Sequence, residues 1–261
     1  MSKSTKKKSV DFTTFSVHPE TFRIIGYLNF WTMAVVSVTI TLLTVHPNPF
    51  IQSPIVSTFG YANICVSWDT GPALIFASIF YIIIDFSIIF HVFLTWLRVW
   101  RDFHQGQITE RFFKFVTVMT IIEAPLIAIF RLCFVIRAEE DIVGHTVGFL
   151  CLEVALAVDA FKSYLYFIIR EHIDKRDTRM WFGLVYLVAL IVTTVCKLTF
   201  TIAILSGNPI WDTESAISVN VGQFLDISWM LQAAVMPLGF AIYLRRATPR
   251  ITFHFFSTDD M

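Results

Sequence analysis

Six long apolar runs constrain this chain more than any other feature of its sequence. A helix needs about 20 mostly apolar residues to cross roughly 30 Å of hydrocarbon, and a backbone in lipid must satisfy its own hydrogen bonds. The runs are Phe22–Val45, Pro72–Leu97, Phe113–Ile136, Val143–Ile168, Trp181–Leu205 and Val219–Tyr243. They predict an all-α polytopic membrane protein, a bundle of six transmembrane helices over residues 22–246. Polar tails are expected at 1–21 and 247–261.

Basic residues predict the orientation of the bundle, because Lys and Arg gather in short cytosolic segments. They occupy both tails and the second and fourth connections, whereas the first, third and fifth connections hold only Arg137 between them. The basic residues of the first group are Lys3, Lys6, Lys7, Lys8, Arg23, Arg98, Arg101, Arg111, Lys114, Arg170, Lys175, Arg176, Arg179, Arg245, Arg246 and Arg250. This alternation predicts that both termini are cytosolic.

Composition excludes several classes of function. The mean hydropathy is +0.67, and 20 basic residues balance 20 acidic ones, so no nucleic-acid partner is expected. The four cysteines form no disulfide framework, since three of them lie in apolar runs. The last run contains no lysine to form a retinal Schiff base, and no motif predicts a cofactor.

Ionisable side chains within the apolar runs are the first candidates for function, because each costs roughly 2.5–3.5 kcal/mol at mid-bilayer. They are Asp85, Glu123, Arg131, Glu153, Asp159, Lys162, Lys197 and Asp226. Asp159 and Lys162 are three residues apart on one helix, so a pair between them is expected. Glu123 precedes Pro125 by two residues. A proline kinks a helix, so Glu123 either lines a cavity there or only accepts local hydrogen bonds.

Four of these charges lie at a similar depth. Arg131, Glu153, Lys197 and Asp226 all fall in the noncytosolic half of their runs, and each comes from a different run. One interpretation is an ionic network that only fixes helix register. The other is a shared polar cavity, open to the noncytosolic side, in which they bind a ligand.

Acidic residues and one histidine add a second group of candidates near the noncytosolic surface. His145 has a pKa near neutrality in its unperturbed state, which suits proton transfer. Asp141 precedes it by four residues and is expected to orient its ring, with Glu140 and Asp69 close by. Transfer or hydrolysis of a lipid acyl group needs such a base and carboxylate. His145, Asp141 and Glu140 are therefore the candidate catalytic residues, and Asp69 joins the candidate binding residues.

A plainer interpretation of the same residues stays open. Acidic side chains are favourable at a helix N-terminus, so both acidic residues before His145 can serve only as caps. Cys65 and Ser67 are candidate nucleophiles by location alone. A metal site formed by His145, Asp141 and Asp69 lacks recognised ligand spacing, and none is predicted.

Three segments resemble a known group of membrane proteins. The run from Glu140 to Phe149 reads E-D-x-x-x-H-x-x-x-F and resembles the matching segment of the post-GPI attachment to proteins factor 2 group. Val66–Pro72 is similar to the I-S-D-T-G element of DRAM-type proteins, with Trp68 as an extra residue. Ile121–Glu123 is similar to a carboxylate-bearing step in the third span of the first group. Together these segments resemble the FRAG/DRAM/SFK superfamily.

The resemblance covers about Phe22 to Arg246 and implies six helices. Its GPI branch implies a protein of the Golgi or endoplasmic reticulum that remodels the lipid of GPI anchors at the noncytosolic leaflet, with membrane lipids as partners. The DRAM branch implies a noncatalytic organiser or autophagy regulator of the lysosome or plasma membrane. This chain lacks the Thr-His-Cys and Leu-Pro-Ser elements of the first branch, and Ala73 and Leu74 follow Pro72 where the second has a Glu. A small channel or transporter is the remaining alternative.

Overall fold

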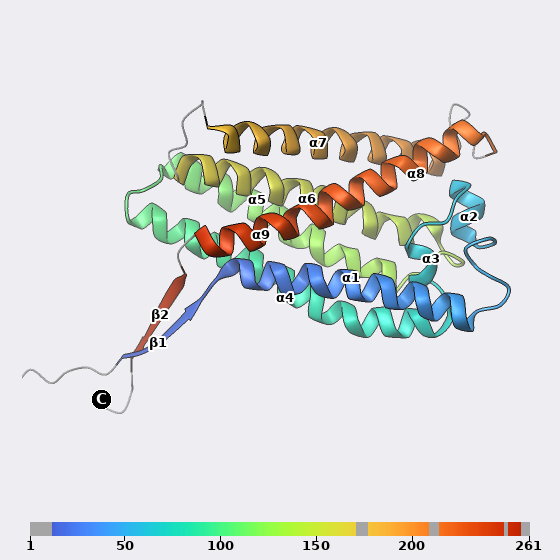
Figure 1. Cartoon of the computed structure of the whole chain (residues 1–261), viewed down its shortest axis with the longest axis horizontal. Coiled ribbons are helices and arrows are strands. Elements are labelled where there is room, and N and C mark those ends of the chain that lie inside the picture. The colour runs from blue at the N-terminus through green and yellow to red at the C-terminus, as the bar shows by residue number, and fades with distance from the viewer. Residues whose placement is uncertain (1–11, 171–176, 209–213, 248–249, 257–261) are drawn as a thin grey trace, which may run out of the picture.

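The computed structural model describes residues 12–170, 177–208, 214–247 and 250–256. Long helices dominate it and run nearly parallel to one axis (Figure 1). The helical elements are α1 (Pro19–Thr44), α2 (Pro54–Phe59), α3 (Cys65–Trp68), α4 (Gly71–His104), α5 (Glu110–Ile129), η1 (Phe130–Phe134), α6 (Ile142–Arg170), α7 (Thr178–Leu205), α8 (Ala216–Met230), η2 (Leu231–Val235) and α9 (Met236–Ala247).

Six helical stretches of the described chain are long and apolar enough to cross a membrane, which confirms the predicted all-α six-helix bundle. α1, α4, α6 and α7 each supply one stretch. α5 continues into the 3-10 segment η1 to form the third, and α8, the π-helical segment η2 and α9 together form the sixth. α4 runs to His104, seven residues beyond the predicted end of its apolar run.

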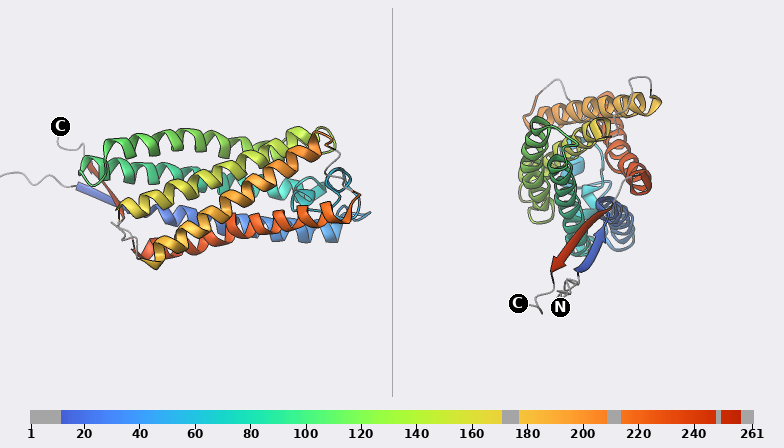
Figure 2. Two further views of the ribbon diagram at one scale, coloured as in Figure 1. Left: turned by 90° about the horizontal axis from the view of Figure 1, so that it is seen from above. Right: turned by 90° about the vertical axis from the view of Figure 1, so that its left-hand side faces the viewer.

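A two-stranded sheet joins the two segments that were expected to be polar tails. β1 (Phe12–Val17) pairs antiparallel with β2 (Ile251–Phe256), with Phe12 opposite Phe256. The strands lie at one end of the bundle, here named the tail end, and α2 and α3 lie at the opposite loop end (Figures 1 and 2). The residues outside the described ranges include six of the orienting cations, namely Lys3, Lys6, Lys7, Lys8, Lys175 and Arg176.

Two glycines allow helices to approach one another closely. A Cβ at Gly26 of α1 would lie 2.9 Å from the Ile88 side chain of α4, so only glycine fits this crossing. A Cβ at Gly148 of α6 would lie 3.0 Å from Cys133 Sγ in η1. These contacts join the first span to the second and the third span to the fourth.

Aromatic side chains fill the bundle where α3 dips into its loop end. Trp68 is fully buried, with its ring centroid 6.0 Å from Phe30, 6.2 Å from Phe130 and 5.6 Å from Phe134. Aromatic pairs at these separations add to the free energy of burial. The tryptophan therefore anchors the α3 segment, and with it the adjoining Asp69, inside the loop end.

Candidate functional site: a polar cavity at the loop end

Three charged side chains from different helices meet inside the loop-end half of the bundle. Lys197 Nζ of α7 lies 2.9 Å from Glu153 Oε1 of α6 and 2.5 Å from Asp226 Oδ1 of α8. The ammonium also lies over the rings of Phe149 and Trp229, at 4.6 and 5.3 Å from their centroids. The structure thus brings together three of the four charged residues that the sequence predicts at a similar depth in the bilayer.

The fourth, Arg131, lies elsewhere. Its guanidinium pairs with Asp85 of α4, and its side chain is 56% exposed. Asp85 also lies 3.5 Å from the Tyr81 hydroxyl. Arg131 therefore forms a separate pair at the outside of the bundle. It contributes nothing to the group formed by Lys197, Glu153 and Asp226, which is named the Lys197 cluster.

A small cavity of about 30 Å³ adjoins the Lys197 cluster. Ile55 and Phe59 of α2 line it on one side. Its polar lining comes from four separate segments and consists of Tyr61, Asn63, Cys65, His145, Thr146, Lys197, Thr201 and Asp226. Burial and a hydrogen bond to Asp226 raise the pKa of Tyr61, so its hydroxyl stays protonated and donates to that carboxylate. A cavity of this size holds about one or two water molecules.

His145 presents an unpartnered nitrogen in this setting. Its Nδ1 lies 2.8 Å from the carbonyl oxygen of Ile136, which can only accept, so Nδ1 carries the proton in the neutral ring. Nε2 then holds a lone pair, and this buried atom has no hydrogen-bond partner. The ring is 2% exposed. The arrangement suits acceptance of a proton from a group that enters the cavity.

The two acidic residues before α6 do not orient that ring. Asp141 Oδ1 accepts a hydrogen bond of 3.0 Å from the backbone N–H of Val143, and Asp141 and Glu140 are both exposed. Asp141 therefore caps α6, as the plainer interpretation expected. The carbonyl oxygen of Ile136, and not the Asp141 carboxylate, orients the His145 ring.

Asp69, which follows α3, forms a hydrogen bond to the loop next to His145. It is 4% exposed, and its Oδ1 accepts a 3.0 Å hydrogen bond from the backbone N–H of Ala138. Burial raises the pKa of Asp69, against the opposing effects of the Ala138 N–H and of nearby His145 and Arg137. Asp69 therefore ties the α3 segment to the loop that carries Ile136.

The two candidate nucleophiles differ in position. Cys65 lines the cavity, but burial raises the pKa of its thiol to about 12, so very little thiolate exists near neutral pH. Ser67 is fully buried and donates its hydroxyl to the carbonyl of Ile64 at 2.7 Å. Neither side chain is activated as a nucleophile.

A second ionic network occupies the tail-end half of the bundle. Asp159 of α6 lies 2.6 Å from Arg23 of α1, whereas its distance to Lys162 is 3.6 Å. Lys162 pairs with Glu123 of α5, so the expected Asp159–Lys162 contact exists but is secondary. Glu20 lies 3.7 Å from both Arg23 and Arg98.

Asp102 is the centre of a further group that sequence reasoning did not identify. This carboxylate is fully buried and accepts hydrogen bonds from Tyr166 at 2.6 Å, from Arg170 at 3.0 Å and from Arg101 at 3.0 Å. A signal for it exists in the sequence. His91, Thr95, Arg98 and Asp102 follow one another at helical spacing and mark one polar face of α4.

An apolar layer separates the two halves. The void between them is only about 20 Å³ and is lined by side chains that include Phe30, Ile84, Phe130, Leu152 and Trp229. The charges on either side are paired, as described above. Within the described residues there is therefore no continuous polar path along the bundle axis, which a channel or transporter in an open state requires.

Comparisons with family models, curated proteins and solved structures found no match to this chain.

Proposed function

We propose that the protein handles lipids of the noncytosolic leaflet at the loop-end cavity. The observation that carries the proposal is the buried, unpartnered Nε2 of His145 beside a water-sized cavity shared with Lys197, Asp226 and Tyr61. The positive-inside rule supports placing this end on the noncytosolic side. Because the cavity is too small for acyl chains, only a polar group of the lipid enters it, and the chains stay in the bilayer.

The finer proposal is remodelling of GPI-anchor lipid, or a related step, in the Golgi or endoplasmic reticulum. It follows from the resemblance of the Glu140–Phe149 and Val66–Pro72 segments to the FRAG/DRAM/SFK superfamily. In such a step His145 Nε2 takes a proton from water as the water oxygen attacks an ester carbonyl carbon. The proton then passes to the departing alcohol oxygen as the ester C–O bond breaks.

A second candidate is a noncatalytic organiser of membrane lipids. It is favoured by the capping role of Asp141 and by the protonated state of Cys65, because neither residue is arranged for catalysis. A channel is not proposed, since the apolar layer interrupts the polar path.

Replacement of His145 by Gln tests the proposal. The amide keeps a polar side chain of similar size but provides no base of useful pKa. Loss of a general base typically lowers a rate by roughly 100- to 10,000-fold, so GPI-lipid remodelling should be lost while protein abundance is unchanged. Asp141→Asn is the matched control and should leave the lipid profile as in wild type.

Three outcomes separate the candidates. A changed lipid profile in His145→Gln alone supports action at the cavity. Unchanged profiles in both variants, together with an altered profile when the whole protein is removed, support the noncatalytic organiser. Unchanged lipids even after removal of the protein contradict lipid handling altogether.

A further inference from the structure

A much larger hollow lies in the opposite half of the molecule. This tail-end groove has a volume of about 830 Å³ and lies between α6, α7 and α9, with Arg23 of α1 in its wall. Its size falls within the range of about 300–1,000 Å³ that is typical of ligand sites. None of the residues considered for lipid chemistry at the loop end lines it.

The groove exists because the sixth span crosses the bundle diagonally. α8 packs on α7, whereas α9 packs on α1, and Figure 1 shows α7 and α9 diverging toward the tail end. The direction changes at η2, just before Pro237, which has no N–H to offer the carbonyl of Gln232. The Tyr186 hydroxyl donates to that carbonyl at 2.8 Å and fixes the deep end of the groove.

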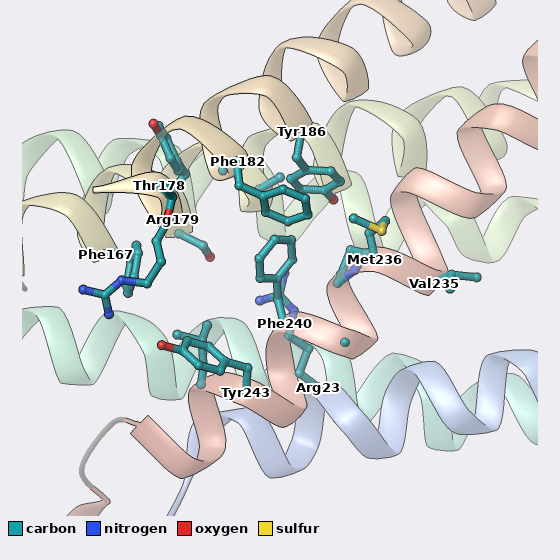
Figure 3. Close-up of a pocket in the computed structure, with 17 residues that line it drawn as sticks. Arg23, Phe167, Thr178, Arg179, Phe182, Tyr186, Val235, Met236, Phe240 and Tyr243 are labelled. Carbon is teal, nitrogen blue, oxygen red and sulfur yellow. The ribbon is translucent and has the colours of Figure 1, made fainter. Parts of the chain in front are cut away.

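The lining of the groove is apolar and open to the bilayer. Phe182 of α7 and Phe240 of α9 face each other with centroids 6.1 Å apart (Figure 3), and Phe182 is 57% exposed. A Cβ added at Gly239 of α9 would have no atom within 4 Å, so this wall borders open space. From Val235 to Arg246 the helix rises about 16 Å, which matches one leaflet of a hydrocarbon core roughly 30 Å thick.

The mouth of the groove is basic. Arg179 lies in the first turn of α7, and Arg245 and Arg246 lie in the last turn of α9, so the two helices carry three exposed arginines at the tail end. Asp177 pairs with Arg179 at 2.6 Å, and among the described residues no carboxylate pairs with Arg245 or Arg246. Figure 3 shows Arg179 and Tyr243 on opposite walls at the mouth. The remaining positive charge complements an anionic headgroup.

The wall of the groove also contains an unused donor. The Arg23 side chain is 7% exposed, and Asp159 holds its Nη2 at 2.6 Å. Its Nε has no hydrogen-bond partner. Figure 3 shows this side chain beside Phe240. A buried N–H without a partner is costly. The atom is shielded from the groove, so an ester carbonyl of a bound lipid would accept from it after a small displacement of the side chains that cover it.

We propose that the tail-end groove binds one phospholipid of the cytosolic leaflet, with an acyl chain packed along the contacting rings of Phe182 and Phe240 and an anionic headgroup at the three arginines. The site is separate from the loop-end cavity, and the inference does not depend on the proposed function. Each part of the lipid has a matching feature: apolar lining for the chain, Arg23 Nε for the ester carbonyl, and the basic mouth for the phosphate.

Native mass spectrometry of the whole protein, released from mixed phosphatidylserine and phosphatidylcholine micelles with identical chains, tests this proposal. Wild type should retain one phosphatidylserine in preference to phosphatidylcholine. Gly239→Phe fills the open wall and should lose retention of both lipids. Val192→Phe, which adds the same ring to an exposed position of α7 outside the groove, should behave as wild type.

Replacement of Arg179, Arg245 and Arg246 by Gln separates headgroup from chain. A basic residue near an anionic surface contributes about fivefold to affinity, so each substitution should lower the preference for phosphatidylserine by about that factor while phosphatidylcholine still binds. Equal retention of both lipids by wild type overturns the headgroup assignment. Undiminished retention by folded Gly239→Phe, or by the milder Gly239→Leu, overturns the groove as the site.

Discussion

Removal of the Lys197 ammonium should strongly destabilise the protein. In Lys197→Met, the carboxylates of Glu153 and Asp226 lose their common counter-ion. The Glu153 side chain is fully buried, so neither water nor another described cation replaces the lost partner. Breaking a buried ion pair in this way typically costs about 3–5 kcal/mol, because an uncompensated charge stays behind.

The cause can be separated from the loss of packing. In the triple variant Lys197→Met, Glu153→Gln and Asp226→Asn, the side-chain shapes remain similar but these three positions carry no charge. Replacement of a whole buried ion network by neutral groups is often close to neutral in stability. The triple variant should therefore recover most of the free energy of unfolding that the single variant loses.

The measurement is the free energy of unfolding in mixed micelles, from titration with sodium dodecyl sulfate. Lys114→Met is the control, since the Lys114–Glu110 pair of 2.7 Å is largely exposed and should contribute little. A triple variant as unstable as Lys197→Met would refute the reasoning, because the loss would then come from packing. So would a single variant as stable as wild type.

Two further predictions concern the loop end and the orientation of the bundle. Burial raises the pKa of Asp69, so its contribution to stability is present at acid pH and is lost as the pH rises through the folded-state pKa. Asp69→Asn keeps an acceptor for the Ala138 N–H, so its free energy of unfolding should increase relative to that of wild type as the pH rises through this pKa. A difference in the free energy of unfolding that does not change with pH contradicts this. Glu140→Cys should react with a membrane-impermeant maleimide from the noncytosolic side, and Gln105→Cys only from the cytosolic side. The labelling of wild type is the control. The reverse pattern would overturn the orientation.

The spans could be predicted from the sequence because hydrocarbon imposes a length and a polarity on every crossing segment. The two strands could not, since FTTFSV and ITFHFF are short and their pairing joins residues 234 or more positions apart. Such a contact depends on the bundle bringing both ends together. Alternation in either segment alone is too weak a signal to distinguish a strand from a polar tail.

The sequence predicts how deep the charged residues of the candidate site lie in the bilayer, but not the direction in which their side chains point. Counting residues along each helix placed Glu153, Lys197 and Asp226 at one level, and these three meet. The same count included Arg131, which lies in η1, where a 3-10 turn changes the direction of its side chain. Depth in the bilayer follows from hydropathy, whereas the direction of a side chain around its helix depends on the packing of the neighbouring helices.

The tail-end network was missed for a related reason. Glu20 and Asp102 lie beside the ends of apolar runs, where a charge is expected to reach water. Both are instead buried, because α4 continues as a helix to His104 and keeps Arg98 and Asp102 on its inner face. A helix that extends past its apolar run thus carries charges into the protein, and only its partners decide whether they remain hydrated.

The tail-end groove depends on a still less predictable property, the direction in which a broken helix continues. Pro237 signals an interruption in the sixth span, but it does not determine whether α9 stays on α7 or crosses to α1. That choice separates the walls and leaves Arg23 between them with a free Nε. If α9 instead packed along α7, the two helices would close the groove along its length and no lipid could enter. The lipid-sized hollow therefore belongs to the half of the bundle where span 6 departs from its sequence neighbour, and the paired charges of the loop end leave room only for a water-sized polar group.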